Sequence, residues 1–265
     1  MKQDSLGIIG IGSMAGAMLD GILAEEVLSP ENIYVTNRHN DDRLKFLNEK
    51  YHVNATRDYS QITSNCKNLL IAVKPKDVAK LVESLKDLVT TDHVIISVAA
   101  GITTQYLEAG FDKEISVIRV MPNTSSRVRE SATGVALGRY VKNEDIDFAK
   151  KILSSIGKVV IVKEELIDAV TGLSGSGPAY VYLMMEAMIQ AGVKQGLPRT
   201  LAEELTFQTV YGAAKMALNT NESPEQLIQQ IATPGGTTRA GLQALERANI
   251  TGAFIDAVSS ATKRS

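Results

Sequence analysis

Cysteine is nearly absent from this chain of 265 residues, which has only Cys66. A single thiol cannot form an internal disulfide, and Cys66 has no neighbouring cysteine or histidine at the spacing of metal ligands. The three histidines, His39, His52 and His93, are scattered without an acid or nucleophile beside them, so we expect them at the surface. The sequence therefore predicts no metal site and a protein of the reducing cytoplasm.

An excess of charge of one sign is also missing, because 28 basic and 30 acidic residues are mixed along the chain. No basic patch for nucleic acid or an anionic membrane surface follows from this pattern. The longest apolar stretch, residues 179–189, is interrupted by Glu186 and is too short to cross a bilayer. The first residues carry no signal-peptide pattern. We therefore expect a cytoplasmic protein that acts on a small molecule.

Short runs of β-branched residues alternate with helical patterns through residue 162. The runs are Leu6–Gly10, Ile33–Thr36, Leu69–Val73, Val94–Val98, Ile115–Val120 and Lys158–Val162. Amphipathic stretches between them, such as Asp41–Lys50, Asp77–Leu88 and Asn143–Ser155, predict helices. This alternation is typical of βαβ units. It predicts an α/β fold, with a doubly wound Rossmann-type parallel sheet domain over residues 1–162.

Helical patterns punctuated by glycine, proline and asparagine replace the strands after residue 162, so residues 163–265 are predicted to form an all-helical domain. Within it, residues 181–189 are apolar on nearly every side, which suits a helix buried all round. Two explanations remain open. A second copy of the chain could cover this helix in an interdigitated dimer, or the helix could lie at the centre of the domain's own core.

A glycine-rich turn follows the first predicted strand. Its residues are Gly10, Ile11, Gly12, Ser13, Met14 and Ala15, in the order of a dinucleotide-binding fingerprint. Gly10 permits the tight turn, Gly12 leaves room for a pyrophosphate, and Ala15 lets the helix pack close to the strand. The free N–H groups of the helix then face the phosphates. The turn therefore predicts a bound dinucleotide.

The second strand lacks the acid with which an NAD-preferring site usually binds the ribose 2′-hydroxyl. It ends instead in Asn37 and Arg38, with Arg43 one helical turn further. A guanidinium there could pair with a 2′-phosphate, which favours NADPH over NADH as the cofactor. The alternative is that both arginines are solvated surface charges.

Ligands of open parallel sheets bind beyond the carboxyl ends of the strands, so the residues after the later strands are further candidates. They are Ala72, Val73, Lys74 and Pro75, then Ala99, Ala100 and Gly101, and finally Asn123. The small residues of the second group would let a flat nicotinamide lie close to the backbone. Lys74 could also act as a general acid, although contact with the cofactor or simple exposure suits its place beside Pro75 better.

A second glycine turn, Thr233, Pro234, Gly235, Gly236, Thr237 and Thr238, precedes a helical pattern in the second half of the chain. Its free N–H donors and hydroxyls could receive a carboxylate. The alternative is a capped turn with only a structural role.

Taken together, five segments closely resemble pyrroline-5-carboxylate reductases nearly end to end. They are residues 10–15, 72–75, 121–124, 174–180 and the stretch from Pro224 to Thr238. The resemblance implies NAD(P)H-dependent reduction of L-1-pyrroline-5-carboxylate to L-proline, the last step of proline biosynthesis, without a metal. It also implies an intertwined homodimer that can assemble into a larger ring, with the active site between one subunit's cofactor domain and the dimer's helices.

The same resemblance assigns roles within the second glycine turn. Thr238 would contact the ring nitrogen as the catalytic hydroxyl. The substrate would also be bound by Thr233, Gly235, Gly236, Thr237 and an acid aligned with Glu222, an alignment that could slip by one residue. The chain departs from the family at Ser125, Arg129 and Ser131, and Tyr59 receives no role.

Two rival functions fit parts of the sequence. A β-hydroxyacid dehydrogenase shares the domain order but needs a catalytic lysine where this chain has residues 174–180. A dinucleotide-sensing regulator would bind cofactor without turnover. NADPH consumption with pyrroline-5-carboxylate would separate all three.

Overall fold

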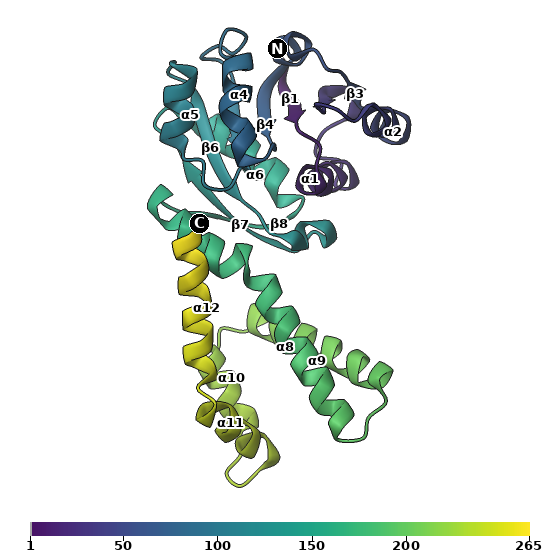
Figure 1. Cartoon of the computed structure of the whole chain (residues 1–265), viewed down its shortest axis with the longest axis vertical. Helices are drawn as coiled ribbons and strands as arrows, with labels where there is room; N and C mark the ends of the chain where they lie inside the picture. The colour runs from purple at the N-terminus through teal and green to yellow at the C-terminus, as the bar shows by residue number, and fades with distance from the viewer. Residues whose placement is uncertain (1) are drawn as a thin grey trace. The chain divides into compact units, whose positions relative to one another are not determined.

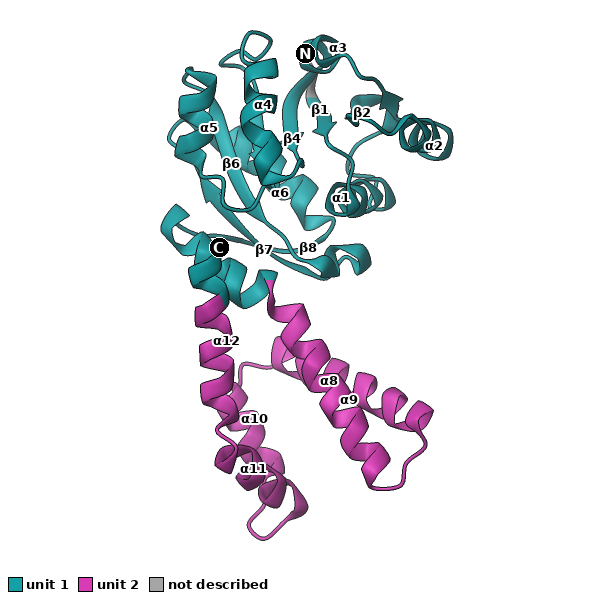
Figure 2. Ribbon diagram, in the orientation of Figure 1, with its two compact units in different colours: residues 1–175, 261–265 teal, residues 176–260 magenta. Residues whose placement is uncertain are grey.

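The computed structural model describes residues 2–265, and the side chains from residue 4 onward. The chain forms two compact units, shown in different colours in Figure 2. Residues 1–175 and 261–265 make up the sheet unit, and residues 176–260 make up the helical unit. The division falls after residue 175, and the last residues return to the sheet unit, whereas the sequence predicts a single boundary at residues 162 and 163.

The sheet unit is built on eight strands in the order β3-β2-β1-β4-β5-β6-β7-β8 (Figure 1). Their bounds are β1 Lys2–Ile9, β2 Ile33–Thr36, β3 Asn54–Ala55, β4 Cys66–Ile71, β5 Val94–Ser97, β6 Ser116–Met121, β7 Ser131–Leu137 and β8 Gly157–Ile161. All six predicted runs are strands. The chain turns outward from β1 in both directions, so β1 and β4 flank the point where the strand order reverses.

Helices cover both faces of the sheet, as a doubly wound fold requires. One face packs against α1 (Ser13–Ala24), α2 (Asp41–Tyr51) and α6 (Asn143–Ser154). The other packs against α3 (Tyr59–Asn65), α4 (Pro75–Leu85) and α5 (Thr104–Phe111). Because side chains alternate along a strand, Ile8 and Leu70 enter the first core, whereas Ile9 and Ile71 enter the second. The Rossmann-type fold is confirmed, and its central strands β4, β5 and β6 are buried on both faces.

One strand pair corrects the prediction of a wholly parallel sheet. Strand β7 runs antiparallel to β6, with Met121 opposite Gly134. Only the short turn η2 (Thr124–Val128) and a few neighbouring residues join them, and a parallel return needs a crossover of a dozen residues or more. Strands β3 and β7 were not predicted. Gly134 in β7 leaves room for the side chain of Val170, because a Cβ at position 134 would lie only 2.6 Å from it.

Short helical turns complete the sheet unit. They are η1 (Pro30–Asn32), η3 (Glu164–Leu166), α7 (Ile167–Val170) and the wide turn η4 (Thr171–Gly175). His93 corrects another expectation, because it is buried rather than exposed. Its Nε2 lies 3.0 Å from the Thr63 carbonyl, and its Nδ1 accepts a hydrogen bond from the Thr90 amide. Burial lowers the pKa of this imidazole below 6.5.

The helical unit contains α8 (Gly177–Lys194), α9 (Arg199–Asn219), α10 (Pro224–Ile231), α11 (Thr237–Arg247) and most of α12 (Ile250–Arg264). Helices α8 and α9 form an antiparallel pair (Figure 1). In the single chain most of the large apolar side chains of these helices are exposed. Among them are Tyr182, Leu183, Leu205, Phe207, Tyr211, Met216, Leu218, Ile231 and Ile255. The central-core interpretation of residues 181–189 is therefore wrong for the single chain, where only Ile189 of that stretch is buried.

Candidate cofactor and substrate sites

A cavity of about 550 Å³ opens where the order of the sheet reverses. The carboxyl ends of β1 and β4 meet there, and the amide of Ala72 donates to the carbonyl of Ile9 at 2.9 Å. Open α/β sheets bind their ligands at such a point. The cavity is lined by Ile9, Gly10, Ile11, Gly12, Thr36, Asn37, Arg38, His39, Tyr59, Ala72, Val73, Lys74, Lys76, Asp77, Lys80, Leu81 and Ser84.

The first glycine turn has the geometry that a diphosphate needs. Gly10 has a φ of +94°, and a Cβ there would lie 2.8 Å from the carbonyl oxygen of Ala72. Nothing lies within 4 Å of the corresponding position at Gly12, which is exposed. Gly12 is the N-cap of α1 and has no side chain to satisfy the first amides of the helix. The turn therefore leaves open space in front of free N–H donors, which fits a phosphate group.

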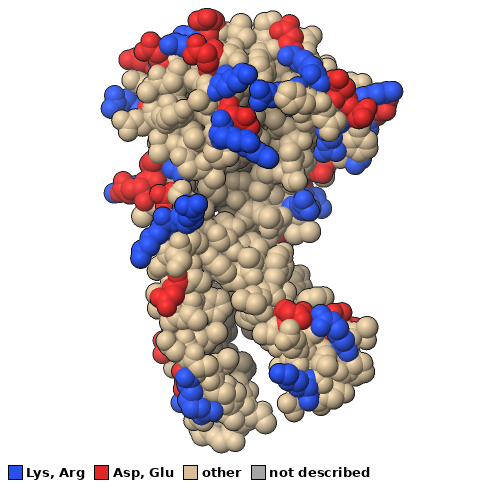
Figure 3. Space-filling model, viewed as in Figure 1, with Lys and Arg blue, Asp and Glu red and all other residues tan. Residues whose placement is uncertain are grey.

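Charged residues line the part of this cavity that lies beyond the first glycine turn. Arg38 follows β2, and its Nη1 lies 3.3 Å from Oδ1 of Asp77, in the first turn of α4. Lys74, Lys76 and Lys80 line the same cavity. In Figure 3 basic side chains gather over α4 with acidic atoms among them. This end of the cavity can hold an anion.

Arg43 does not share this position. Its guanidinium stacks on the ring of Phe46, 5.3 Å from the ring centroid, and it is not among the residues that line the cavity. Of the two arginines considered for a 2′-phosphate, the structure therefore places only Arg38 in the cavity.

The cavity brings together eight of the predicted cofactor residues. They are Gly10, Ile11, Gly12, Asn37, Arg38, Ala72, Val73 and Lys74. Ser13, Met14 and Ala15 form the first turn of α1 beside it, and Pro75 begins α4. Sequence reasoning missed Ile9, Thr36, His39, Tyr59 and the α4 residues Lys76, Asp77, Lys80, Leu81 and Ser84. Helix α4 contributes to the cavity through its position beside β1, which no local motif signals.

Ala99, Ala100 and Gly101 lie in the loop between β5 and α5, outside the lining of this cavity. Gly101 adopts a φ of +70°, which favours glycine. The amide of Ala99 bonds to Oγ of the buried Ser97 at 3.3 Å, and Thr103 caps α5 through the amide of Tyr106. These contacts fix the main chain on both sides of the loop.

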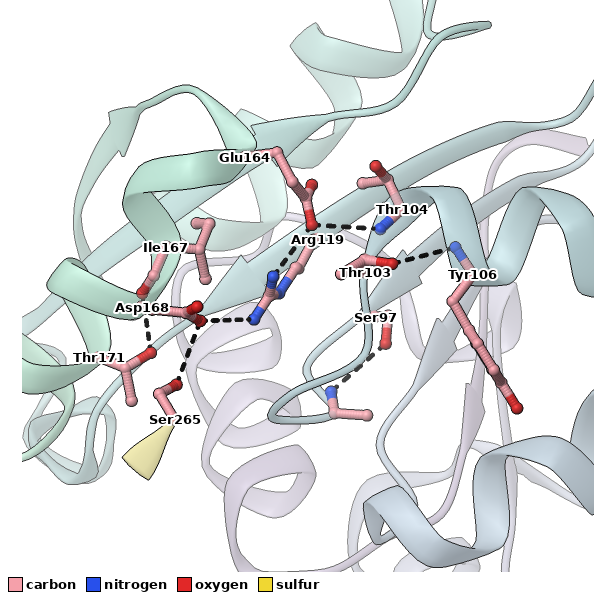
Figure 4. A network of polar contacts seen from close by, with 11 residues as sticks. Ser97, Thr103, Thr104, Tyr106, Arg119, Glu164, Ile167, Asp168, Thr171 and Ser265 are labelled. Carbon is pink, nitrogen blue, oxygen red and sulfur yellow. Dashed lines mark hydrogen bonds and ion pairs between the residues drawn. The ribbon is translucent and has the colours of Figure 1, made fainter. Parts of the chain in front are cut away.

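A buried arginine supports the same loop (Figure 4). Arg119 of β6 is 3% exposed and pairs with Glu164 at 2.9 Å and Asp168 at 3.4 Å. Glu164 also accepts a hydrogen bond from the amide of Thr104 at the start of α5. The hydroxyl of Ser265 contacts Asp168. The network thereby connects β6, the loop before α5, the turns after β8 and the last residue.

Asn123 follows β6, and its side chain is occupied by structural contacts. Its Nδ2 donates to the carbonyl of Ser174 at 3.0 Å, and its Oδ1 accepts from the amide of Ser125. The Asn123 amide donates to the hydroxyl oxygen of Ser131 at 3.0 Å, and Ser131 is one of the residues at which the chain departs from the expected pattern. Asn123 therefore anchors the turn after β6 to η4.

The second glycine turn joins α10 to α11. Gly235 has a φ of +71°, and Gly236 is the N-cap of α11 without a side-chain cap. Thr233 closes the turn by accepting a bond from the Gly236 amide at 3.0 Å. Thr237 is exposed and Thr238 is half-buried in the first turn of the helix. The amides at this helix start are available to a carboxylate.

Glu222 lies before α10 and bonds to Gln230 of the same helix. Ser223 caps α10 through a reciprocal pair with Gln226. Among residues 2–265 no group of three or more histidine, cysteine, aspartate and glutamate side chains could hold a metal ion. Over the same described range, every helix is too short or too polar to traverse a membrane.

The chain is 43% identical over 260 residues to pyrroline-5-carboxylate reductase 2 of Bacillus subtilis (strain 168), covering 98% of this chain and 93% of the relative. The chain belongs to the pyrroline-5-carboxylate reductase family. The predicted resemblance is confirmed, and with it the enzyme class, an NAD(P)H-dependent oxidoreductase that forms proline. A relative from Methanosarcina acetivorans is 39% identical over 265 residues, covering 100% of this chain and 98% of its own.

Solved structures of pyrroline-5-carboxylate reductases share the fold. The Coxiella burnetii enzyme matches with a TM-score of 0.94 at 40% identity, covering 99% of this chain and 97% of the other. The Plasmodium falciparum protein, solved with NADP bound, matches with a TM-score of 0.87 at 30% identity, covering 98% of this chain and 96% of the other.

Two family models match separate parts of this member of the pyrroline-5-carboxylate reductase family. Residues 164–265 match pyrroline-5-carboxylate reductase dimerisation, and residues 5–101 match the family described as NADP oxidoreductase, coenzyme F420-dependent. Prephenate dehydrogenase of Aquifex aeolicus shares only the fold, at 13% identity and a TM-score of 0.54.

Proposed function

We propose that this chain reduces L-1-pyrroline-5-carboxylate to L-proline with NADPH, as a homodimer in the cytoplasm. One observation carries the cofactor half of this proposal, the coincidence of the glycine cradle with the basic cavity at the reversal of the sheet. Family membership supports the substrate.

The cofactor would lie along the carboxyl edge of the sheet. Free amides at Gly12, Ser13 and Met14 would hold the diphosphate at the start of α1. Asn37 and Arg38 would bind the adenosine ribose and its phosphate, and Ala72 to Pro75 would line the middle of the path. Ala99, Ala100, Gly101 and Asn123 would border the nicotinamide. When bound, the cofactor supplies the hydride.

The substrate would be held by the turn before α11. The free amides of Gly235 and Thr237 would receive its carboxylate, while the Gly236 amide closes the turn on the Thr233 carbonyl. Glu222 would be a further substrate contact. A cyclic imine accepts hydride more readily once its nitrogen is protonated. The hydroxyl of Thr238, a poor acid by itself, would orient the protonated ring nitrogen as a hydrogen-bonding group. Fixing the ring in one orientation lowers the entropic part of the barrier.

Preference for NADPH rests on Arg38, the arginine that lines the cavity, and on the absence of an acid at the end of β2. Replacing Arg38 with alanine should weaken the binding of NADPH much more than the binding of NADH. An equal effect on both cofactors would refute a contact with the 2′-phosphate.

Dimerisation is supported by the match of residues 164–265 to a dimerisation family and by the exposed apolar side chains of α8 and α9. A larger ring built from such dimers is an extension of the same proposal. A cytoplasmic location fits the single, buried cysteine.

The test is Thr238→Ala, assayed by NADPH consumption with pyrroline-5-carboxylate. Loss of one hydrogen bond to a charged group costs about 1.5–3 kcal/mol, so kcat should fall by roughly tenfold to a hundredfold. The dissociation constant of NADPH should not change. Thr251→Ala, in the first turn of α12, is the matched control. Unchanged turnover in Thr238→Ala would remove this hydroxyl from the mechanism, and absence of turnover in the parent chain would refute the proposed reaction.

A further inference from the structure

The Arg38 side chain in the cofactor cavity already has an anionic partner. Its Nη1 lies 3.3 Å from Oδ1 of Asp77, and both residues line the cavity. The two come from different elements, since Arg38 follows β2 and Asp77 lies in the first turn of α4. An acid is absent from the end of β2, where a dinucleotide fold usually carries one. The carboxylate of Asp77 in α4 instead lies beside Arg38, just after that strand.

The main chain of Arg38 is fixed independently of this pair. Nη1 of Arg57 donates to the Arg38 carbonyl at 3.0 Å, and Arg57 itself pairs with Asp41 at the start of α2. The Arg38 guanidinium is half-exposed, so its side chain can exchange partners while its backbone stays in place. A phosphate bound at this guanidinium must therefore displace Asp77 or share Arg38 with it.

We propose that Asp77 is a cofactor-selectivity residue, whose carboxylate holds Arg38 and thereby limits the preference for a dinucleotide with a 2′-phosphate. The inference rests on the proposed NADPH site. A 2′-phosphate competes with Asp77 for the guanidinium, which must release the carboxylate in order to bind the phosphate. A free 2′-hydroxyl meets no such competition, because a carboxylate accepts a hydrogen bond from it.

Asp77 also has a purely structural explanation, which the test must separate from selectivity. An acid in the first turn of a helix is stabilised by the helix dipole, and α4 begins at Pro75 without a side-chain cap. That role predicts a lower Tm for an uncharged variant and equal changes in affinity for both cofactors. Selectivity predicts unequal changes.

The experiment measures binding of NADPH and NADH by isothermal titration calorimetry in the full chain, without substrate. Asp77→Asn keeps the side-chain shape and removes the charge. Its NADPH dissociation constant should fall about fivefold, the upper range for a partly exposed charge pair, while that of NADH stays the same or rises. Adenosine 2′,5′-bisphosphate and 5′-AMP, as probes without nicotinamide, should show the same difference.

Two further variants localise the effect. Glu83→Gln makes the same charge change on α4 at an exposed position outside the cavity lining, and it should alter neither affinity. In the Arg38→Ala background, Asp77→Asn should lose most of its effect on NADPH, because the shared partner is gone. Parallel changes for NADPH and NADH, or an undiminished effect without Arg38, would overturn the proposal. If the parent chain bound neither dinucleotide, the proposed function would fail as well, whereas intact binding with an inert Asp77 would refute the selectivity role alone.

Discussion

The two compact units bury their apolar side chains in different ways. In the sheet unit two continuous cores fill the space on both faces of the strands, and Ile8, Leu70, Ile71 and Ile96 are fully buried. In the helical unit few apolar side chains are buried, while Leu183 of α8 and Leu218 of α9 are 73% and 85% exposed in the single chain. The sheet unit thus carries its own core, and the helical unit does not.

This contrast explains why one unit can be understood from a single chain and the other cannot. A helical domain of under 100 residues with so much exposed apolar surface needs another surface to cover it. In the homodimer that we propose, the partner's α8 and α9 would supply that cover. Stability of the helical unit should then depend on protein concentration, whereas local stability of the sheet unit should not.

The largest expected effect comes from a charge placed on the exposed apolar face of α8. Leu183→Asp would bury an unpaired carboxylate in the proposed dimer at a cost of about 4 kcal/mol, or roughly a thousandfold in the dissociation constant. Analytical ultracentrifugation should show monomers, and turnover should fall with dimer content. Calorimetric binding of NADPH should persist, because the sheet unit folds on its own core.

Val128→Asp is the matched control for this variant, because Val128, at 69%, is the most exposed large apolar side chain among those described in the sheet unit. It should leave the sedimentation unchanged. If Leu183→Asp remained dimeric, or if Val128→Asp dissociated, the helical unit would not be the unit that depends on a partner surface.

The next effect concerns the charge network within the sheet unit. Arg119→Met removes the buried partner of Glu164 and Asp168, and breaking such a pair costs about 3 kcal/mol. Urea denaturation should report this loss, and the additional Glu164→Gln change should recover part of it. Arg129→Met, which removes an exposed pair with Glu25, should cost about 1 kcal/mol or less. Equal losses of unfolding free energy in the two arginine variants would show that the buried ion pairs of Arg119 stabilise the fold no more than an exposed pair does.

The sheet unit was also the easier one to predict from sequence, for a physical reason. Its central strands are buried on both faces and read as β-branched runs, and the turn from Gly10 to Ala15 encodes its geometry locally. Strand β7 escaped detection because its residues include serine, glycine and alanine rather than a β-branched run. Strand β3 is only two residues long.

Residues that reach a site through tertiary packing were not predictable. Helices α3 and α4 pack beside β1 and β4, and they thereby bring Tyr59, Lys76, Asp77 and Lys80 to the cofactor cavity. No periodicity in the sequence predicts this packing. The substrate turn from Thr233 to Thr238 was found because it combines two glycines with a helix start. Its role came from the family resemblance, since such geometry alone also suits a capped turn.

The smallest expected effect uses His93 to probe the sheet unit by pH. Burial lowers the pKa of His93 in the folded chain, so between that pKa and 6.5 the unfolded chain holds a proton that the folded chain lacks. Stability contributed by the neutral imidazole is therefore present above pH 6.5 and is lost as the pH falls, by at most about 1.4 kcal/mol per pH unit. Urea unfolding of the sheet unit at pH 7 and pH 5.5 should show a shallower pH dependence in His93→Gln than in the parent chain. Removing His93 also breaks its bonds to Thr63 and Thr90, so the informative quantity is the slope. His52→Asn, at an exposed left-handed position that asparagine tolerates, is the control variant. A slope of the parent chain no steeper than that of His93→Gln would mean that His93 takes up its proton at the same pH in the folded and the unfolded chain.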